Sequence, residues 1–211
     1  MTILTLNDND MTELLHQQLS TLQQEVANLP FNQALLQETL PLRLYVGQLE
    51  AYLTIHRTLE AQLKSHAHPA IEAIWRTEMA RTMLLEQDLS NFQTDIPTAP
   101  LQRAMSTFVH YVEKSGQTNP LYLIGVLYAL HSLAWETQAA RQHLQHTFSL
   151  QDKGVAYFSA YHGEAAMQWK TFKQRMNITI TDPLEKQIII EHAQETFRYI
   201  KELLKVLWQS R

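Results

Sequence analysis

Histidine and carboxylate side chains are the residues of this chain best suited to chemistry, because the sequence contains no cysteine. That absence excludes disulfides, thiolate catalysis and iron–sulfur ligation. Imidazole and carboxylate groups can bind metal ions, and five of them occur in two apolar segments: Glu50, His56, Glu60, His131 and Glu136. A metal site needs ligands that converge on one point, and the spacing of these five does not establish convergence. A di-metal site therefore stays open as an alternative.

A second pair of polar residues lies in the first apolar segment of the chain. His16 and Gln23 are seven residues apart. Seven residues are almost two helical turns, which leaves a rotation of only about 20° and a rise of about 10 Å. Both residues therefore share one helix face, at the margin of the apolar stripe that contains Leu15 and Leu22.

Helical spacing of apolar residues runs through nearly the whole chain and predicts an all-α fold of seven or eight helices. We expect the first helix to start after Asn7–Asp10 and to stop at Pro30, and residues 1–8 to be disordered or extended. Asp182 followed by Pro183 and Glu185 is the clearest helix start. The other expected helices are 41–65, 71–89, about 101–116, 121–146 and 155–175, with a loop at 91–100 and an extended link at 178–181.

Composition narrows the function classes. The chain has 211 residues, a formal charge of −4 and 45% hydrophobic residues, which indicates one globular domain over 1–211 with no nucleic-acid partner. No uninterrupted apolar run reaches the length of about 18 residues that spans a bilayer, and the N-terminus has no secretory signal pattern. We therefore expect a cytoplasmic protein without a membrane partner.

Four short motifs occur in the order in which they occur in one known family. They are Leu59-Glu60, Leu85 to Leu89 (Leu-Glu-Gln-Asp-Leu), Gly154 to Gly163 followed by Trp169 and Phe172, and Glu191 to Phe197. These segments resemble the heme oxygenase family, in particular its bacterial biliverdin-producing type, over about 12–207. The resemblance implies a heme-oxygenase-like multi-helical bundle and identifies the chain as a divergent member.

The resemblance implies a histidine on the first helix as the proximal heme ligand. Counting back without gaps from Leu59-Glu60 places Gln23 at that position. Matching the residue pattern from Thr12 to Leu19 to the family's pattern around its ligand instead places His16 at the proximal position. This alignment requires a seven-residue insertion after His16. Imidazole ligates heme iron well, whereas a carboxamide does not. Both positions remain open at the level of the sequence, and His16 is the candidate iron ligand.

The distal helix departs from the family pattern. The family has a glycine-rich segment there, which lets the backbone approach the heme closely. In this chain Ser132, Glu136 and Thr137 replace the three glycines, and Leu133 replaces an aspartate of the animal members. These changes favour a continuous helix and fill space beside the heme face.

The family motifs, together with the changed distal positions, predict a protein that binds heme, another tetrapyrrole or a small apolar ligand. We expect oxygen-dependent heme cleavage to be lost or altered. One alternative is an active heme oxygenase that converts heme to biliverdin, iron and carbon monoxide with His16 as ligand. Only that alternative requires an electron donor, a ferredoxin or a reductase. The others are a di-metal oxidase on the same fold and a purely structural or partner-binding role.

Overall fold

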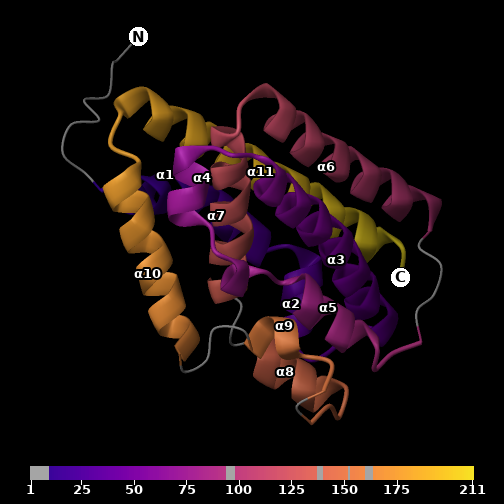
Figure 1. Ribbon diagram of the computed structural model, residues 1–211. Helices are drawn as coiled ribbons and strands as arrows, with labels where there is room; N and C mark the ends of the chain where they lie inside the picture. The colour runs from indigo at the N-terminus through magenta and orange to yellow at the C-terminus, as the bar shows by residue number, and fades with distance from the viewer. Residues whose placement is uncertain (1–9, 94–97, 137–139, 152, 160–163) are drawn as a thin grey trace.

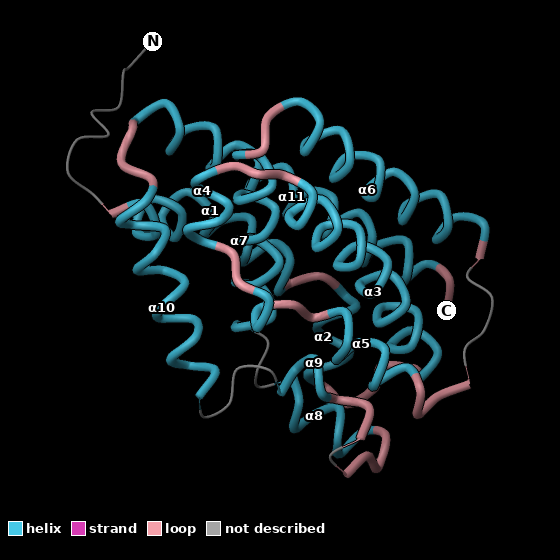
Figure 2. The backbone as a smooth tube through the Cα atoms, in the orientation of Figure 1, coloured by secondary structure: helices cyan, strands magenta, loops and turns pink. Residues whose placement is uncertain are grey.

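The computed structural model describes residues 10–93, 98–136, 140–151, 153–159 and 164–211. Within these ranges the chain forms eleven α-helices and one 3₁₀ turn, with no strand (Figures 1 and 2). The predicted all-α class is confirmed, and the helices outnumber the seven or eight expected. The expectation for residues 1–8 lies outside the described part. No described helix is both long enough and apolar enough to cross a membrane.

The helices follow one another along the chain with short connections. Their bounds are α1 Met11–Ala27, α2 Pro30–Leu36, α3 Leu42–Ser65, α4 Pro69–Ile74, α5 Thr82–Leu89, α6 Ala99–Thr118, α7 Leu121–Glu136, α8 Ala140–Thr147, α9 Ala156–Ser159, α10 Glu164–Thr179 and α11 Pro183–Gln209. The 3₁₀ turn Thr77–Met79 lies between α4 and α5.

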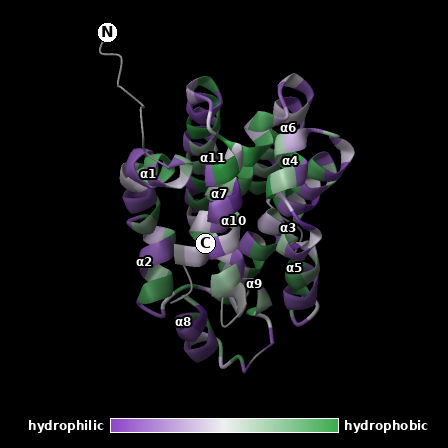
Figure 3. Cartoon of the chain, turned by 60° about the vertical axis from the view of Figure 1, so that its left-hand side comes forward, coloured by the Kyte–Doolittle hydropathy of each residue, from purple (hydrophilic) through white to green (hydrophobic). Residues whose placement is uncertain are grey.

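The core forms around α7, which packs along α11 and also contacts α3 and α6. Every α7 residue from Leu123 to Ala134 is buried, which agrees with the apolar sequence of this helix. Figure 3 shows hydrophobic residues along α7 and α11 in the interior of the bundle. In Figure 1, α10 flanks this bundle on one side and α8 and α9 lie at its lower end.

One predicted boundary holds and another proved wrong. The first helix ends at Ala27, before Pro30 as expected, and Pro30 begins α2, where its missing amide is not needed by a helical hydrogen bond. Ile178 and Thr179 belong to α10 and do not form an extended link. The helix continues there because Met176 and Ile180, four residues apart, are both fully buried.

The predicted helix over 71–89 is broken into α4, the 3₁₀ turn and α5. A carboxylate from α3 explains the break: Glu60 Oε1 accepts hydrogen bonds from the backbone N–H groups of Arg81 at 2.7 Å and Thr82 at 3.0 Å. These amides begin α5, and a helix start needs such acceptors. The cap comes from a distant helix, so local periodicity does not reveal it.

The Asp182 cap is confirmed, since its carboxylate accepts from the N–H groups of Leu184 at 2.8 Å and Glu185 at 3.0 Å. The expected helix 121–146 contains α7 and most of α8, and the expected helix 155–175 contains α9 and most of α10. Residues 137–139 and 160–163 lie outside the described part, as does the middle of the expected loop at 91–100.

Gly125 lets α7 approach α11 closely, and its replacement provides a test of that packing. An added Cβ at Gly125 would lie 2.5 Å from the carbonyl oxygen of Ile189 and 2.9 Å from the amide nitrogen of Ala193. Backbone cannot move aside as a flexible side chain can, so we expect Gly125→Ala to lower the free energy of unfolding by about 1–3 kcal/mol. Urea unfolding followed by circular dichroism measures this change.

Gly47→Ala is the matched control. Its Cβ would meet only the side chains of Leu207, at 3.0 Å, and Leu101, at 3.6 Å. These leucine side chains can move aside, whereas the backbone beside Gly125 cannot. Alanine raises the helix propensity in both variants, so we expect Gly47→Ala to lose less stability than Gly125→Ala. Equal losses in both variants would show that the α7–α11 approach is not as tight as the structure indicates.

Candidate functional site

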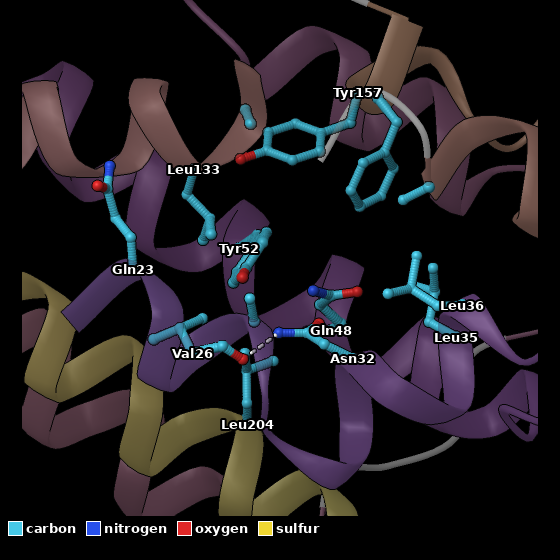
Figure 4. Close-up of a pocket in the computed structure, with 14 residues that line it drawn as sticks. Gln23, Val26, Asn32, Leu35, Leu36, Gln48, Tyr52, Leu133, Tyr157 and Leu204 are labelled. Carbon is cyan, nitrogen blue, oxygen red and sulfur yellow. Dashed lines mark hydrogen bonds between the residues drawn. The ribbon is translucent and has the colours of Figure 1, made fainter. Parts of the chain in front are cut away.

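A cavity of about 150 Å³ opens between the N-terminal helices and the central helix. Its walls come from α1, α2, α3, α7, α8, α9 and α11, and Figure 4 shows the side chains around it. The lining residues are Gln23, Val26, Ala27, Asn32, Leu35, Leu36, Gln48, Tyr52, Leu133, Ala134, Ala140, Tyr157, Phe158 and Leu204. None of them carries a charge, so the cavity is mostly apolar with a few polar groups.

The structure separates the two candidates for the proximal position. Both lie on α1, but His16 is exposed and is not part of the cavity wall. Gln23 is half-buried and lines the cavity. The seven-residue spacing places both residues on the same side of α1, yet of the two only Gln23 lines the cavity. Which of them corresponds to the family's proximal position stays a prediction.

The distal positions are distributed along the end of α7. Leu133 lines the cavity, whereas Ser132 is buried elsewhere and bonds back to the carbonyl of Ala129 at 3.0 Å. Glu136 is the last residue of α7, and Thr137 lies outside the described part. Of the residues that the sequence analysis singled out, Gln23 and Leu133 are therefore brought together on the cavity wall.

The five potential metal ligands do not form a site. No group of three or more His, Cys, Asp or Glu side chains within the described ranges is placed to hold a metal ion. Glu60 is engaged in capping α5. His56 and His131 do lie near each other, with ring centroids 6.3 Å apart.

His56 and His131 belong to a buried polar cluster directly behind the cavity wall. The Nε2 atom of His56 lies 3.3 Å from the hydroxyl of Tyr157, which lines the cavity. Burial, with a smaller contribution from the positive charge of Arg81, lowers the pKa of His56 to about 3. Burial also lowers the pKa of His131 well below its usual value. Both imidazoles are therefore neutral at pH 7.

The acidic residues Glu60 and Asp88 of the family motifs hold the starts of other helices in place, a role that the sequence alone did not indicate. Asp88 is fully buried, and its two carboxylate oxygens accept from the N–H groups of Ala156 at 2.6 Å and Tyr157 at 2.8 Å. Asp88 thus caps α9 and fixes the position of Tyr157 at the cavity. The Leu-Glu-Gln-Asp-Leu motif and the Leu59-Glu60 motif each supply one buried carboxylate to the start of another helix.

Two further cavity residues were missed, Gln48 and Tyr52 on α3. They are 4% and 2% exposed. Burial raises the pKa of Tyr52 to about 12, so its hydroxyl stays protonated. In the sequence, Tyr52 lies on the apolar stripe of the expected helix 41–65, where an aromatic residue is typical of core packing. The signal that could have revealed the pair is a glutamine placed four residues before a tyrosine on that same stripe.

The cavity does not fit heme. Drug-sized ligands occupy pockets of about 300–1,000 Å³, whereas an apolar cavity of about 150 Å³ holds a molecule the size of benzene. Among the described residues, no histidine lines this cavity. It also offers no cationic side chain to the two propionates of heme. A second hollow of about 550 Å³, between α3, α6 and the end of α11, has no histidine on its wall either.

Comparison with known proteins places the fold. The chain is similar to heme oxygenase-1 from the cyanobacterium Synechocystis, solved in complex with heme, with a TM-score of 0.86, 18% identity, and coverage of 96% of this chain and 94% of that chain. It is also similar to heme oxygenase from Leptospira interrogans, with a TM-score of 0.83, 16% identity, and coverage of 93% and 98%.

A third similar structure is a domain of unknown function with a heme oxygenase-like fold from Shewanella denitrificans, with a TM-score of 0.73, 14% identity, and coverage of 96% and 93%. No curated protein matches this chain. The sequence model of the family described as heme oxygenase matches residues 9–206, almost the entire chain. The chain therefore belongs to the heme oxygenase family, as a divergent member.

Proposed function

We propose that this chain binds a small apolar ligand in the cavity between α1, α3 and α7 and does not cleave heme. The observation that carries the proposal is the presence of Gln23, and no imidazole, at the wall of a cavity of about 150 Å³. Apolar side chains on the remaining walls favour an uncharged ligand, because an unpaired charge is costly to remove from water. An electron donor has no role in this function.

Active heme cleavage is the competing function, because a similar family structure is a complex with heme. It requires iron ligation, and in this chain His16 is the candidate ligand although it is exposed. Heme binding at His16 would need α1 to rotate or the heme to lie outside the cavity. The exposure of His16 and the size of the cavity both favour the small-ligand function.

A hemin titration followed by absorbance tests the proposal. We expect no Soret band of histidine-ligated heme, and we expect His16→Ala and Gln23→Ala to give the same spectra as the unmodified protein. A ligated spectrum that disappears only in His16→Ala would overturn the proposal. In parallel, benzene is expected to raise the midpoint of thermal unfolding in a concentration-dependent manner, because a ligand that binds only the folded state stabilises it.

A further inference from the structure

Two polar atoms at the cavity make no hydrogen bond within bonding distance to the described residues. They are the Oε1 atom of Gln48 and the hydroxyl oxygen of Tyr52, although the Gln48 side chain lies close enough to Tyr52 to oppose the rise that burial causes in its pKa. Both side chains are more than nine-tenths buried. A buried polar group without a partner is costly, so such groups in a folded protein usually meet a water molecule or a ligand.

The two atoms belong to one wall. Gln48 and Tyr52 are four residues apart on α3, so their side chains lie on the same helix face. Figure 4 shows them in the middle of the cavity, with Gln23 and Leu133 on one side and Leu35 and Leu36 on the other. Gln48 and Tyr52 therefore form one polar spot on the α3 wall of the cavity.

The other polar residues at the wall are engaged within the protein. The Asn32 amide donates to the carbonyl of Val26 at 2.7 Å. The hydroxyl of Tyr157 pairs with His56. Gln23 also has an interaction within the protein. Gln48 Oε1 and the Tyr52 hydroxyl are consequently the polar groups best placed to recognise a ligand. Gln48 Oε1 can only accept a hydrogen bond, whereas the Tyr52 hydroxyl can donate or accept one.

We infer that the cavity binds a neutral six-membered ring with one hydroxyl group, a ligand of the size and chemistry of phenol. Its hydroxyl would donate to Gln48 Oε1 and accept from the Tyr52 hydroxyl, and its ring would contact Leu35, Leu133 and Leu204. The volume of about 150 Å³ sets the size, since a cavity of that volume holds one benzene-sized ring. This inference rests on the proposed small-ligand function and specifies its ligand.

Isothermal titration of the full chain with phenol, its methyl ether anisole, and benzene tests the inference. Two additional hydrogen bonds predict that phenol binds about tenfold more tightly than benzene. Anisole keeps the ring and the oxygen but cannot donate to Gln48, so we expect it to lose most of that preference.

Variants at the polar spot identify the atoms responsible. Tyr52→Phe and Gln48→Leu are each expected to reduce the preference for phenol over benzene, and the double variant is expected to abolish it while benzene still binds. Tyr157→Phe is the matched control, because it removes a hydroxyl from the same wall that already has a partner. It is expected to keep the preference. Circular dichroism is used to check that each variant is folded.

The possible outcomes separate the inference from the proposed function. If benzene binds and phenol binds no more tightly, the inference is wrong and the small-ligand function stands. If none of the three compounds binds to the folded protein, both are wrong. A phenol preference that survives in the double variant would also overturn the inference, because the hydroxyl would then be recognised elsewhere.

Discussion

Hemin incubated with the unmodified protein and ascorbate is expected to give no more biliverdin than hemin with ascorbate alone. Turnover requires iron held by an axial ligand and room for oxygen on the opposite face. Gln23, at the position proposed as proximal, and Leu133, beside the positions proposed as distal, both line the cavity. The interior is close-packed, so neither requirement can be met by a small adjustment of side chains. Absorbance in the visible region and extraction of the pigment measure the product.

Two substitutions test the missing imidazole and the filled space separately. Gln23→His places an imidazole on the cavity wall, and Leu133→Ala removes side-chain volume at another part of that wall. Because one shortened leucine leaves the cavity of about 150 Å³ smaller than heme, we expect neither the single variants nor the double variant to give the Soret intensity of a heme oxygenase with hemin. A heme oxygenase of known activity serves as the positive control for the assay. Robust biliverdin formation by the unmodified chain would show that the interpretation of both faces is wrong.

The fold was predictable from the sequence wherever a helix is specified by its own residues. The Asp182 cap and the apolar residues of α7 are local features, and both predictions proved right. The break between α4 and α5 depends on Glu60, which is 21 residues away from Arg81 in sequence. Periodicity within a window of one helix cannot contain such a contact. Helix boundaries set by tertiary capping therefore need the structure.

The site was predictable only in part, for a similar reason. The alternative positions His16 and Gln23 have the same phase on α1, so the sequence could not separate them. What separates them is the packing around α1, which leaves His16 exposed and places Gln23 at the cavity. Gln48 was missed because a single amide within an apolar stripe does not alter its periodicity. The structure shows that this amide is buried and that its Oε1 atom makes no hydrogen bond to the described residues.

Acidification from pH 7 to pH 5 is expected to destabilise the protein through its buried histidines. In the folded protein the pKa of His56 is about 3, whereas in the unfolded chain it is close to 6.5. Above pH 6.5 the imidazole is neutral in both states and contributes no pH dependence. Below pH 6.5 only the unfolded state takes up the proton, so stability falls as pH falls until about pH 3. For one histidine the loss between pH 7 and pH 5 is about 2 kcal/mol.

His56→Gln tests this prediction, because glutamine does not titrate but can still hydrogen-bond to the Tyr157 hydroxyl. We expect this variant to lose about 2 kcal/mol less than the unmodified protein over the same pH range, measured as the free energy of urea unfolding at each pH. His131, whose pKa burial also lowers, adds a further loss that both proteins share. His16→Gln changes an exposed histidine and is expected to keep the pH dependence of the unmodified protein. If His56→Gln and His16→Gln behave alike, His56 is protonated in the folded state, and the buried neutral cluster behind the cavity does not exist as described.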